Sequence, residues 1–465
     1  MTAEPDPASL PASGEASVPP RGSRSVFSRM AKNVGWIAGS RGFNAVLGVA
    51  YLAAAARALG PASFGAFALM LTYAQLIANF VQFQSWKGVI RYGALHVSAG
   101  RPDCLARLFG FTATLDFASA IAGALIAIVA IPLVGPLLHW APQEQSTAAT
   151  FAGILLLTTG ATPAGMLRLF NRFDLAAYCE VVGPMTRLVG SVAAWIAGAG
   201  VHAFLVIWVV AAIAQAASQW TAAVLINRSR LSFGRRSFKQ ALQENERLWP
   251  FMLQTNVSNS VTMFWTQLGT LAVGAVVGPA EAGGFRLAKR LSKGIMRPVQ
   301  PVIIAIYPEL TRLVAEDDHA QLRRVVTRVA VGSAALALAV ALIATVAGRE
   351  ILHLLAGKRF EFAYMFFVLL SVATAIDLAG FAFEPLQNAH GRSWNVLRAK
   401  LIGAVVYAGL LVVLLPRFGG NGAAIAAIIC SSLIFVQLAY FTVKVLRRRQ
   451  DTPAPDSVGL GPLPG

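Results

Sequence analysis

The chain has 465 residues, 56% of them hydrophobic and only 13% charged, and its mean hydropathy is +0.62. This composition excludes an ordinary soluble domain and indicates a protein that crosses a membrane several times. A net charge of +18 would favour a nucleic-acid partner in a soluble protein, so the positions of the cations decide what this charge means.

The segment 1–32 is rich in Pro, Ser, Gly and Ala and turns basic near its end, which is typical of a disordered tail. It lacks the basic region followed by an apolar stretch that is typical of a signal peptide. No cleavable signal peptide is therefore predicted, and the first span must itself direct insertion.

Twelve segments are apolar and long enough to cross the bilayer. An N-terminal bundle over 33–226 holds six, at 33–56, 64–84, 109–138, 149–168, 178–198 and 203–226. After a basic linker at 227–249, a C-terminal bundle over 250–446 holds spans at 250–277, 283–309, 326–347, 361–385, 396–415 and 421–445. A second disordered tail follows at 447–465. The predicted fold is an all-α polytopic membrane protein with about twelve transmembrane helices.

Most of the 39 Lys and Arg residues lie in the tails and in alternate loops on one side of these spans. The positive-inside rule places that side, and both termini, in the cytoplasm. Because cytoplasmic loops beside anionic lipids attract cations, the net charge needs no nucleic-acid partner.

A short motif, G-P-A-x-x-G-x-F, begins at Gly60 and again at Gly278, 218 residues later. Each copy falls in the non-cytoplasmic turn between the first and second helix of its half. Since six is an even number, the halves share one orientation and form parallel repeats, which enclose a central cavity where they meet.

Five cations lie on one face of the eighth span: Arg286, Lys289, Arg290, Lys293 and Arg297. At about 100° per residue they fall within an arc of roughly 100° and extend about 16 Å along the helix. One such residue would be explained by snorkelling to the headgroups. Five favour a water-filled cavity and an anionic cargo, since intramembrane charges are usually functional.

The repeat maps this basic face onto a polar face of the second span, with Thr72, Gln75 and Asn79. Two interpretations remain open for these side chains, cavity lining and hydrogen bonding between helices. Pro298 and Pro301 follow the basic face and are predicted to kink the eighth helix, either as a hinge or as static packing.

Carboxylates at membrane depth are costly and are normally paired or wet. Asp377 and Asp116 are candidates for ion coupling, and Asp377 is the first choice. The alternative for Asp377 is a structural hydrogen bond between helices. Asp116 is expected instead to pair with Arg187 within the first half. Substrate contact and structural pairing are both open for Arg41.

Motifs for enzymatic chemistry are missing from the sequence. There is no Walker A loop, and neither the six histidines nor the three cysteines have metal-ligand or redox spacing. We therefore expect no ATP, cofactor or metal, and no enzyme.

Three segments resemble bacterial polysaccharide flippases of the multidrug/oligosaccharidyl-lipid/polysaccharide transporter superfamily: ARALGPASFGAF at 56–67, VGPAEAGGFR at 277–286 and YPEL at 307–310. The resemblance implies two six-helix bundles, alternating access, and transport of undecaprenyl-pyrophosphate-linked oligosaccharide to the periplasmic leaflet of the inner membrane. It also implies that cavity cations meet the pyrophosphate. Relatives that flip the peptidoglycan precursor typically add two helices, which are not seen here.

The resulting hypothesis is a flippase for an anionic lipid-linked oligosaccharide, working beside membrane lipid, polysaccharide polymerase and glycosyltransferases. Two rivals remain: a cation-coupled multidrug exporter, and a non-transporting scaffold for polysaccharide enzymes. A basic cavity would repel the cationic cargo of an exporter, and a scaffold needs no open cavity.

Overall fold

The computed structural model describes residues 23–226, 235–294, 319–390 and 392–447, and every element assigned within these ranges is helical. The N-terminal half contains α1 (Ser23–Val81), α2 (Ser85–Ser98), α3 (Pro102–Leu137), α4 (Pro142–Leu157), α5 (Ala161–Leu169), α6 (Phe173–Ile196) and α7 (Val201–Ile226). After α8 (Arg235–Glu244), the C-terminal half contains α9 (Leu248–Val276), α10 (Pro279–Gly294), α12 (His319–Val346), α13 (Gly348–Ala356), η2 (Lys358–Ala363), α14 (Tyr364–Ala379), α15 (Phe383–Ala389), α16 (Ser393–Phe418) and α17 (Gly420–Arg447).

Helix α1 is a hairpin of two arms. Gly60 is not helical, with φ 71° and ψ 175°, a backbone geometry that glycine adopts at least cost. Tyr51 and Phe67 lie on either side of it, and both rings contact Trp208, at centroid distances of 5.1 and 4.8 Å. In a straight helix these residues would be about 24 Å apart. The two arms therefore lie side by side and correspond to the predicted spans 33–56 and 64–84.

Within the described residues, eight stretches are long and apolar enough to cross a membrane, and one of them, 39–98, contains both arms of α1. Helices α6 and α9, with 24 and 29 residues, are also long enough to cross. Together with α10, these make the predicted twelve spans. The rest of the eighth span, with Arg297, Pro298 and Pro301, lies outside the described residues.

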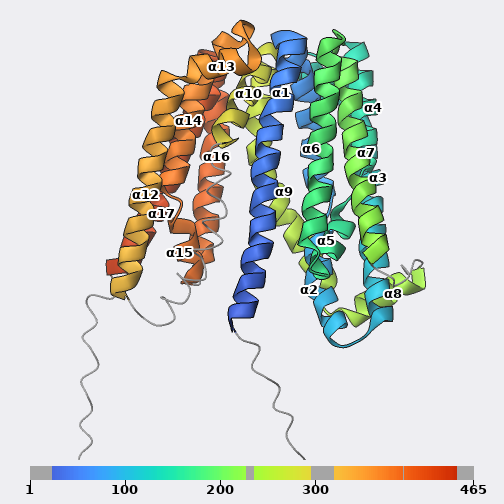
Figure 1. Cartoon of the computed structure of the whole chain (residues 1–465). Coiled ribbons are helices and arrows are strands. Elements are labelled where there is room, and N and C mark those ends of the chain that lie inside the picture. Colours follow the sequence, from blue (N-terminus) through green and yellow to red (C-terminus); the bar gives the residue numbers. More distant parts are fainter. Residues whose placement is uncertain (1–22, 227–234, 295–318, 391, 448–465) are drawn as a thin grey trace, which may run out of the picture.

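The helices gather into two groups (Figure 1). Helices α3, α4, α6 and α7 form one side and α12, α14, α16 and α17 the other, with α1, α9 and α10 between them. Two helices lie partly or wholly in segments for which no span was predicted. Helix α1 already begins at Ser23, within the segment predicted as a tail, and α8 lies within the predicted linker.

The halves share a core at the end of the molecule where α13 lies (Figure 1). Phe64 of α1 packs edge-on against Phe360 of η2, with ring centroids 5.6 Å apart. Arg57 donates from Nε to the backbone oxygen of Leu355, 3.0 Å away, and so satisfies a carbonyl near the end of α13. The first copy of the glycine motif, which contains Phe64, therefore lies where the halves are joined.

Candidate substrate site

A cavity of about 320 Å³ lies between the halves and contains four of the five predicted cations. Its described lining consists of Tyr51, Leu52, Leu71, Gln75, Arg187, Trp208, Thr266, Gln267, Thr270, Arg286, Lys289, Arg290 and Lys293. The cations of α10 lie 8 to 15 residues beyond Gly278, or about 12 to 22 Å along the helix. This depth lies inside a hydrocarbon layer about 30 Å thick.

Arg286 is held by the opposite half of the protein. Its Nη1 donates to the hydroxyl of Thr72, and its Nη2 donates to Oε1 of Gln75 at 3.2 Å. Its Nη1 also lies 3.5 Å from the backbone oxygen of Ala68, the residue that corresponds to Arg286 in the first repeat. The guanidinium is therefore positioned before any ligand arrives.

Lys289 is held within its own half, because its Nζ donates to the backbone oxygen of Thr266 on α9. That bond uses one of the three donors of the ammonium group. Lys289 therefore keeps donors for a ligand.

Arg290 and Lys293 are less committed to protein partners. The guanidinium of Arg290 lies over the bare backbone of Gly48, and its Nη2 is 3.5 Å from the Tyr51 hydroxyl. Lys293 is exposed on the cavity side of α10. Both side chains thus offer several donors to an anion in the cavity.

Arg187 brings a fifth cation, and it comes from the N-terminal half. Its guanidinium lies 5.5 Å from the ring centroid of Trp208 and 6.0 Å from that of Tyr51, within the range of cation–π attraction. Its Nε is buried and has no hydrogen-bond partner among the residues that the structure describes. Arg187 was not predicted from the sequence to line the cavity, although it lies near the middle of its span, as the basic face does.

The predicted pair between Asp116 and Arg187 is wrong. Asp116 is buried and accepts hydrogen bonds from the Ser85 hydroxyl and from the backbone N–H and hydroxyl of Thr162, at 2.9 and 2.7 Å. Ser85 begins α2 and Thr162 lies in the first turn of α5, so the carboxylate joins two helix starts to α3. A carboxylate is stabilised at a helix N-terminus by the free N–H groups and the helix dipole.

The other carboxylates at membrane depth also have partners. Asp377 is hydrogen-bonded to Ser431 and interacts electrostatically with Lys293 and Lys400. Glu180 pairs with Arg168 at 2.9 Å, and Glu384 pairs with Lys400 at 2.7 Å. Of these acids, Asp377 is thus linked electrostatically to a cavity cation.

The remaining predicted site residues are placed as follows. Thr72 is fully buried beside Arg286 and does not itself line the cavity, whereas Gln75 does. Asn79 lies outside the lining, and its backbone oxygen accepts a hydrogen bond from Ser260 at 2.8 Å. Arg41 is exposed on the first arm of α1, also outside the lining.

The cavity has a strongly positive lining. Five cations face it, and none of its described lining residues is Asp or Glu. The lining also contains the amides of Gln75 and Gln267, the hydroxyls of Tyr51, Thr266 and Thr270, and the indole of Trp208. A lining of this kind can bind an anion that carries further hydrogen-bonding groups.

A model of a family of polysaccharide biosynthesis proteins matches residues 54–364, more than half of the chain. The chain belongs to this polysaccharide biosynthesis family. Over 342 residues it is 28% identical to inner membrane protein YghQ of Escherichia coli K12, a match that covers 73% of this chain and 95% of YghQ.

Two solved structures show the same fold. The inward-facing conformation of a multidrug resistance MATE family transporter of the MOP superfamily has a TM-score of 0.71 at 14% identity, covering 88% of this chain and 96% of that one. Lipid II flippase MurJ in an inward closed conformation has a TM-score of 0.63 at 13% identity, covering 86% of each chain. The chain is therefore an all-α polysaccharide biosynthesis protein with several helices that can cross a membrane, and it shares its fold with a MATE family transporter and a lipid II flippase, as the resemblance predicted.

Proposed function

We propose that the protein moves undecaprenyl-pyrophosphate-linked oligosaccharide from the cytoplasmic to the periplasmic leaflet by alternating access. The observation that carries the proposal is the cavity between the halves, with five lining cations and no carboxylate among its described lining residues. A pyrophosphate accepts several charge-assisted hydrogen bonds at once, and these are strongest where bulk water is excluded.

A multidrug transporter and a lipid flippase both have this fold, so the fold does not distinguish drug export from lipid flipping. The charge of the cavity does distinguish them. A cationic drug held 4 Å from one cavity cation would be repelled by about 1 to 4 kcal/mol, depending on the local dielectric. Five cations would multiply that repulsion. A scaffold without transport would need no such cavity, so this alternative leaves the cations unexplained.

In this proposal the cations have different roles, which follow from how strongly each is already held by the protein. Arg290, Lys293 and Arg187 have uncommitted donors and bind the pyrophosphate oxygens. Arg286 and Lys289, which are already held by protein oxygens, fix the shape of the site and add positive charge. Thr72 then positions Arg286, while Gln75 and Gln267 face the sugar hydroxyls.

Three predicted contacts extend this site. Arg297 follows Lys293 by four residues, so a helix continued to that point would add it to the same face. Arg41 and Asn79 lie outside the lining of this state and would meet the substrate in another state of the cycle. Pro298 and Pro301 would form the hinge of the eighth helix.

Transport requires the two halves to rock about the bound headgroup. Arg187 comes from one half and the α10 cations from the other, so an anion between them reduces the repulsion that would oppose closure. Asp377, near Lys293, is the proposed coupling group: an ion bound to Asp377 would leave Lys293 free for the substrate. The proposed orientation has both termini in the cytoplasm, beside glycosyltransferases, with the polymerase receiving the product.

A flipping assay in proteoliposomes tests the proposal with a fluorescent, pyrophosphate-linked oligosaccharide. Arg290→Ala and Lys293→Ala should each slow transport about tenfold or more, because each removes a charge-assisted bond. Arg398→Ala is the matched control, since Arg398 is exposed on α16 outside the cavity. Unchanged transport in both cavity variants, or transport of cationic dyes instead, would reject the proposal.

A further inference from the structure

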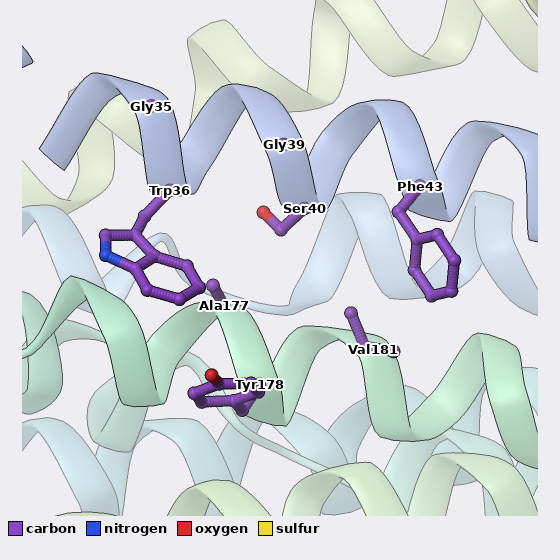
Figure 2. Close-up of a pocket in the computed structure, with 8 residues that line it drawn as sticks. All are labelled: Gly35, Trp36, Gly39, Ser40, Phe43, Ala177, Tyr178 and Val181. Carbon is purple, nitrogen blue, oxygen red and sulfur yellow. The ribbon is translucent and has the colours of Figure 1, made fainter. Parts of the chain in front are cut away.

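A second and larger cavity, of about 520 Å³, lies between the first arm of α1 and α6. Figure 2 shows Trp36, Ser40 and Phe43 on α1 facing Ala177, Tyr178 and Val181 on α6 across this groove. Gly35 and Gly39 complete its lining. The groove opens at the surface, because Tyr178 is 61% and Phe43 50% exposed.

The groove is largely apolar, and two of its eight lining residues are glycines of α1. A Cβ atom added at Gly35 or Gly39 would meet nothing within 4 Å, so these glycines are not required by close packing. None of the eight lining residues is charged. The groove therefore suits a hydrocarbon chain and not a second polar group.

The groove leads toward the cationic cavity along the same pair of helices. Phe43 in the groove precedes Tyr51 in the cavity by 8 residues of α1, or about 12 Å along the axis. On α6, Val181 precedes Arg187 by about 9 Å. Beside the groove, Asn44 on α1 donates from Nδ2 to the backbone oxygen of Glu180 on α6 at 3.3 Å and so links the two helices.

We propose that this groove holds the polyprenyl chain of the substrate whose pyrophosphate occupies the cationic cavity, an inference that rests on the proposed function. The headgroup must move to mid-membrane between the halves while its chain stays in apolar surroundings. Drawing the chain into a wet cavity would weaken binding about fourfold for each exposed methylene. An apolar groove that begins about two helical turns from the cations avoids this exposure.

The chain is held there by its tether and not by hydrophobic attraction alone. Bilayer lipids are as apolar as the groove, so a free hydrocarbon chain gains little by entering it. A chain attached to a bound pyrophosphate has a high effective concentration at the groove and displaces ordinary lipid. The groove should therefore select for substrates that carry both groups.

The test compares two ligands of the purified full-length protein in detergent: inorganic pyrophosphate and a polyprenyl pyrophosphate. Gly39→Leu fills the groove and should weaken binding of the polyprenyl pyrophosphate about tenfold while leaving inorganic pyrophosphate unchanged. Gly332→Leu is the control, because Gly332 is an exposed helical glycine of α12 with nothing within 4 Å of a Cβ atom. A melting curve confirms that each variant is folded, and Gly35→Leu provides a second variant.

Photolabelling gives an independent readout. A polyprenyl pyrophosphate with a diazirine on its chain should label Trp36 or Tyr178 in the wild-type protein, and excess inorganic pyrophosphate should suppress the labelling. An unchanged ratio of the two affinities in Gly39→Leu and Gly35→Leu, or labelling that a phospholipid removes as well, would overturn the inference while leaving the cationic site intact. If neither pyrophosphate binds the wild type, the proposed function fails with it.

Discussion

Gly65 and Gly283, equivalent positions of the two repeats, lie back to back where the halves meet. A Cβ atom on Gly283 would stand 2.9 Å from the Cα atom of Gly65 and 3.1 Å from a ring carbon of Phe64. The repeated motif therefore has a physical reason: a side chain in either copy would push the halves apart.

Replacing Gly283 with Ala should destabilise the protein by about 1 to 3 kcal/mol, because backbone atoms cannot move aside as a flexible side chain can. Thermal unfolding in detergent measures the effect. Gly332→Ala, in open space on α12, should be neutral or slightly stabilising. Equal melting temperatures for the two variants would show that the halves do not pack as described.

Replacing Gly48 with Ala should weaken pyrophosphate binding without changing any charge. The new methyl group would lie 3.3 Å from Cζ of Arg290 and would contact its Nη2 more closely, so the guanidinium must move. Losing one charge-assisted bond lowers affinity about 10- to 100-fold, which calorimetry can measure. Gly409→Ala on α16, where a Cβ meets nothing within 4 Å, should bind like the wild type.

Replacing Arg187 with Gln should reduce pyrophosphate affinity about tenfold and make binding less dependent on salt, because one cation is lost from the cavity. Arg187→Lys should recover part of the affinity. A titration at two ionic strengths distinguishes the variants. Identical affinities for Arg187→Gln and wild type would remove this residue from the site.

Replacing Asp116 with Leu should destabilise the N-terminal half by about 3 kcal/mol or more, because the N–H and hydroxyl of Thr162 and the hydroxyl of Ser85 lose their buried acceptor. Asp116→Asn, which keeps one acceptor oxygen, should cost less. A double-mutant cycle with Arg187→Gln should be additive within about 0.5 kcal/mol, since the two residues share no partner in the described structure. A larger coupling energy would restore the pair expected from the sequence.

Replacing Asp377 with Asn should tighten pyrophosphate binding and slow ion-driven transport. The carboxylate lies near Lys293 and competes with the substrate for that cation. Binding in detergent and flipping under an imposed ion gradient measure the two effects separately. If both stay at wild-type values, Asp377 serves only its hydrogen bond to Ser431.

The sequence by itself determined the number of spans, the repeat and the basic face of the eighth helix. Each depends on local properties, namely hydropathy over about twenty residues, a repeated turn, and the 3.6-residue period that sets one face of a helix. For this reason Arg286, Lys289, Arg290 and Lys293 share one cavity as predicted.

Only the tertiary structure decided which side chains from other helices meet them. Arg187 and Asp116 looked like partners because both are charged and lie within spans of the same half, but helix breaks before Ser85 and before α5 gave Asp116 other donors. Arg187 does not pair with Asp116 and instead lines the cavity. Side-chain partners depend on the rotation and breaks of helices packed from distant parts of the chain, and one sequence pattern is compatible with many such arrangements.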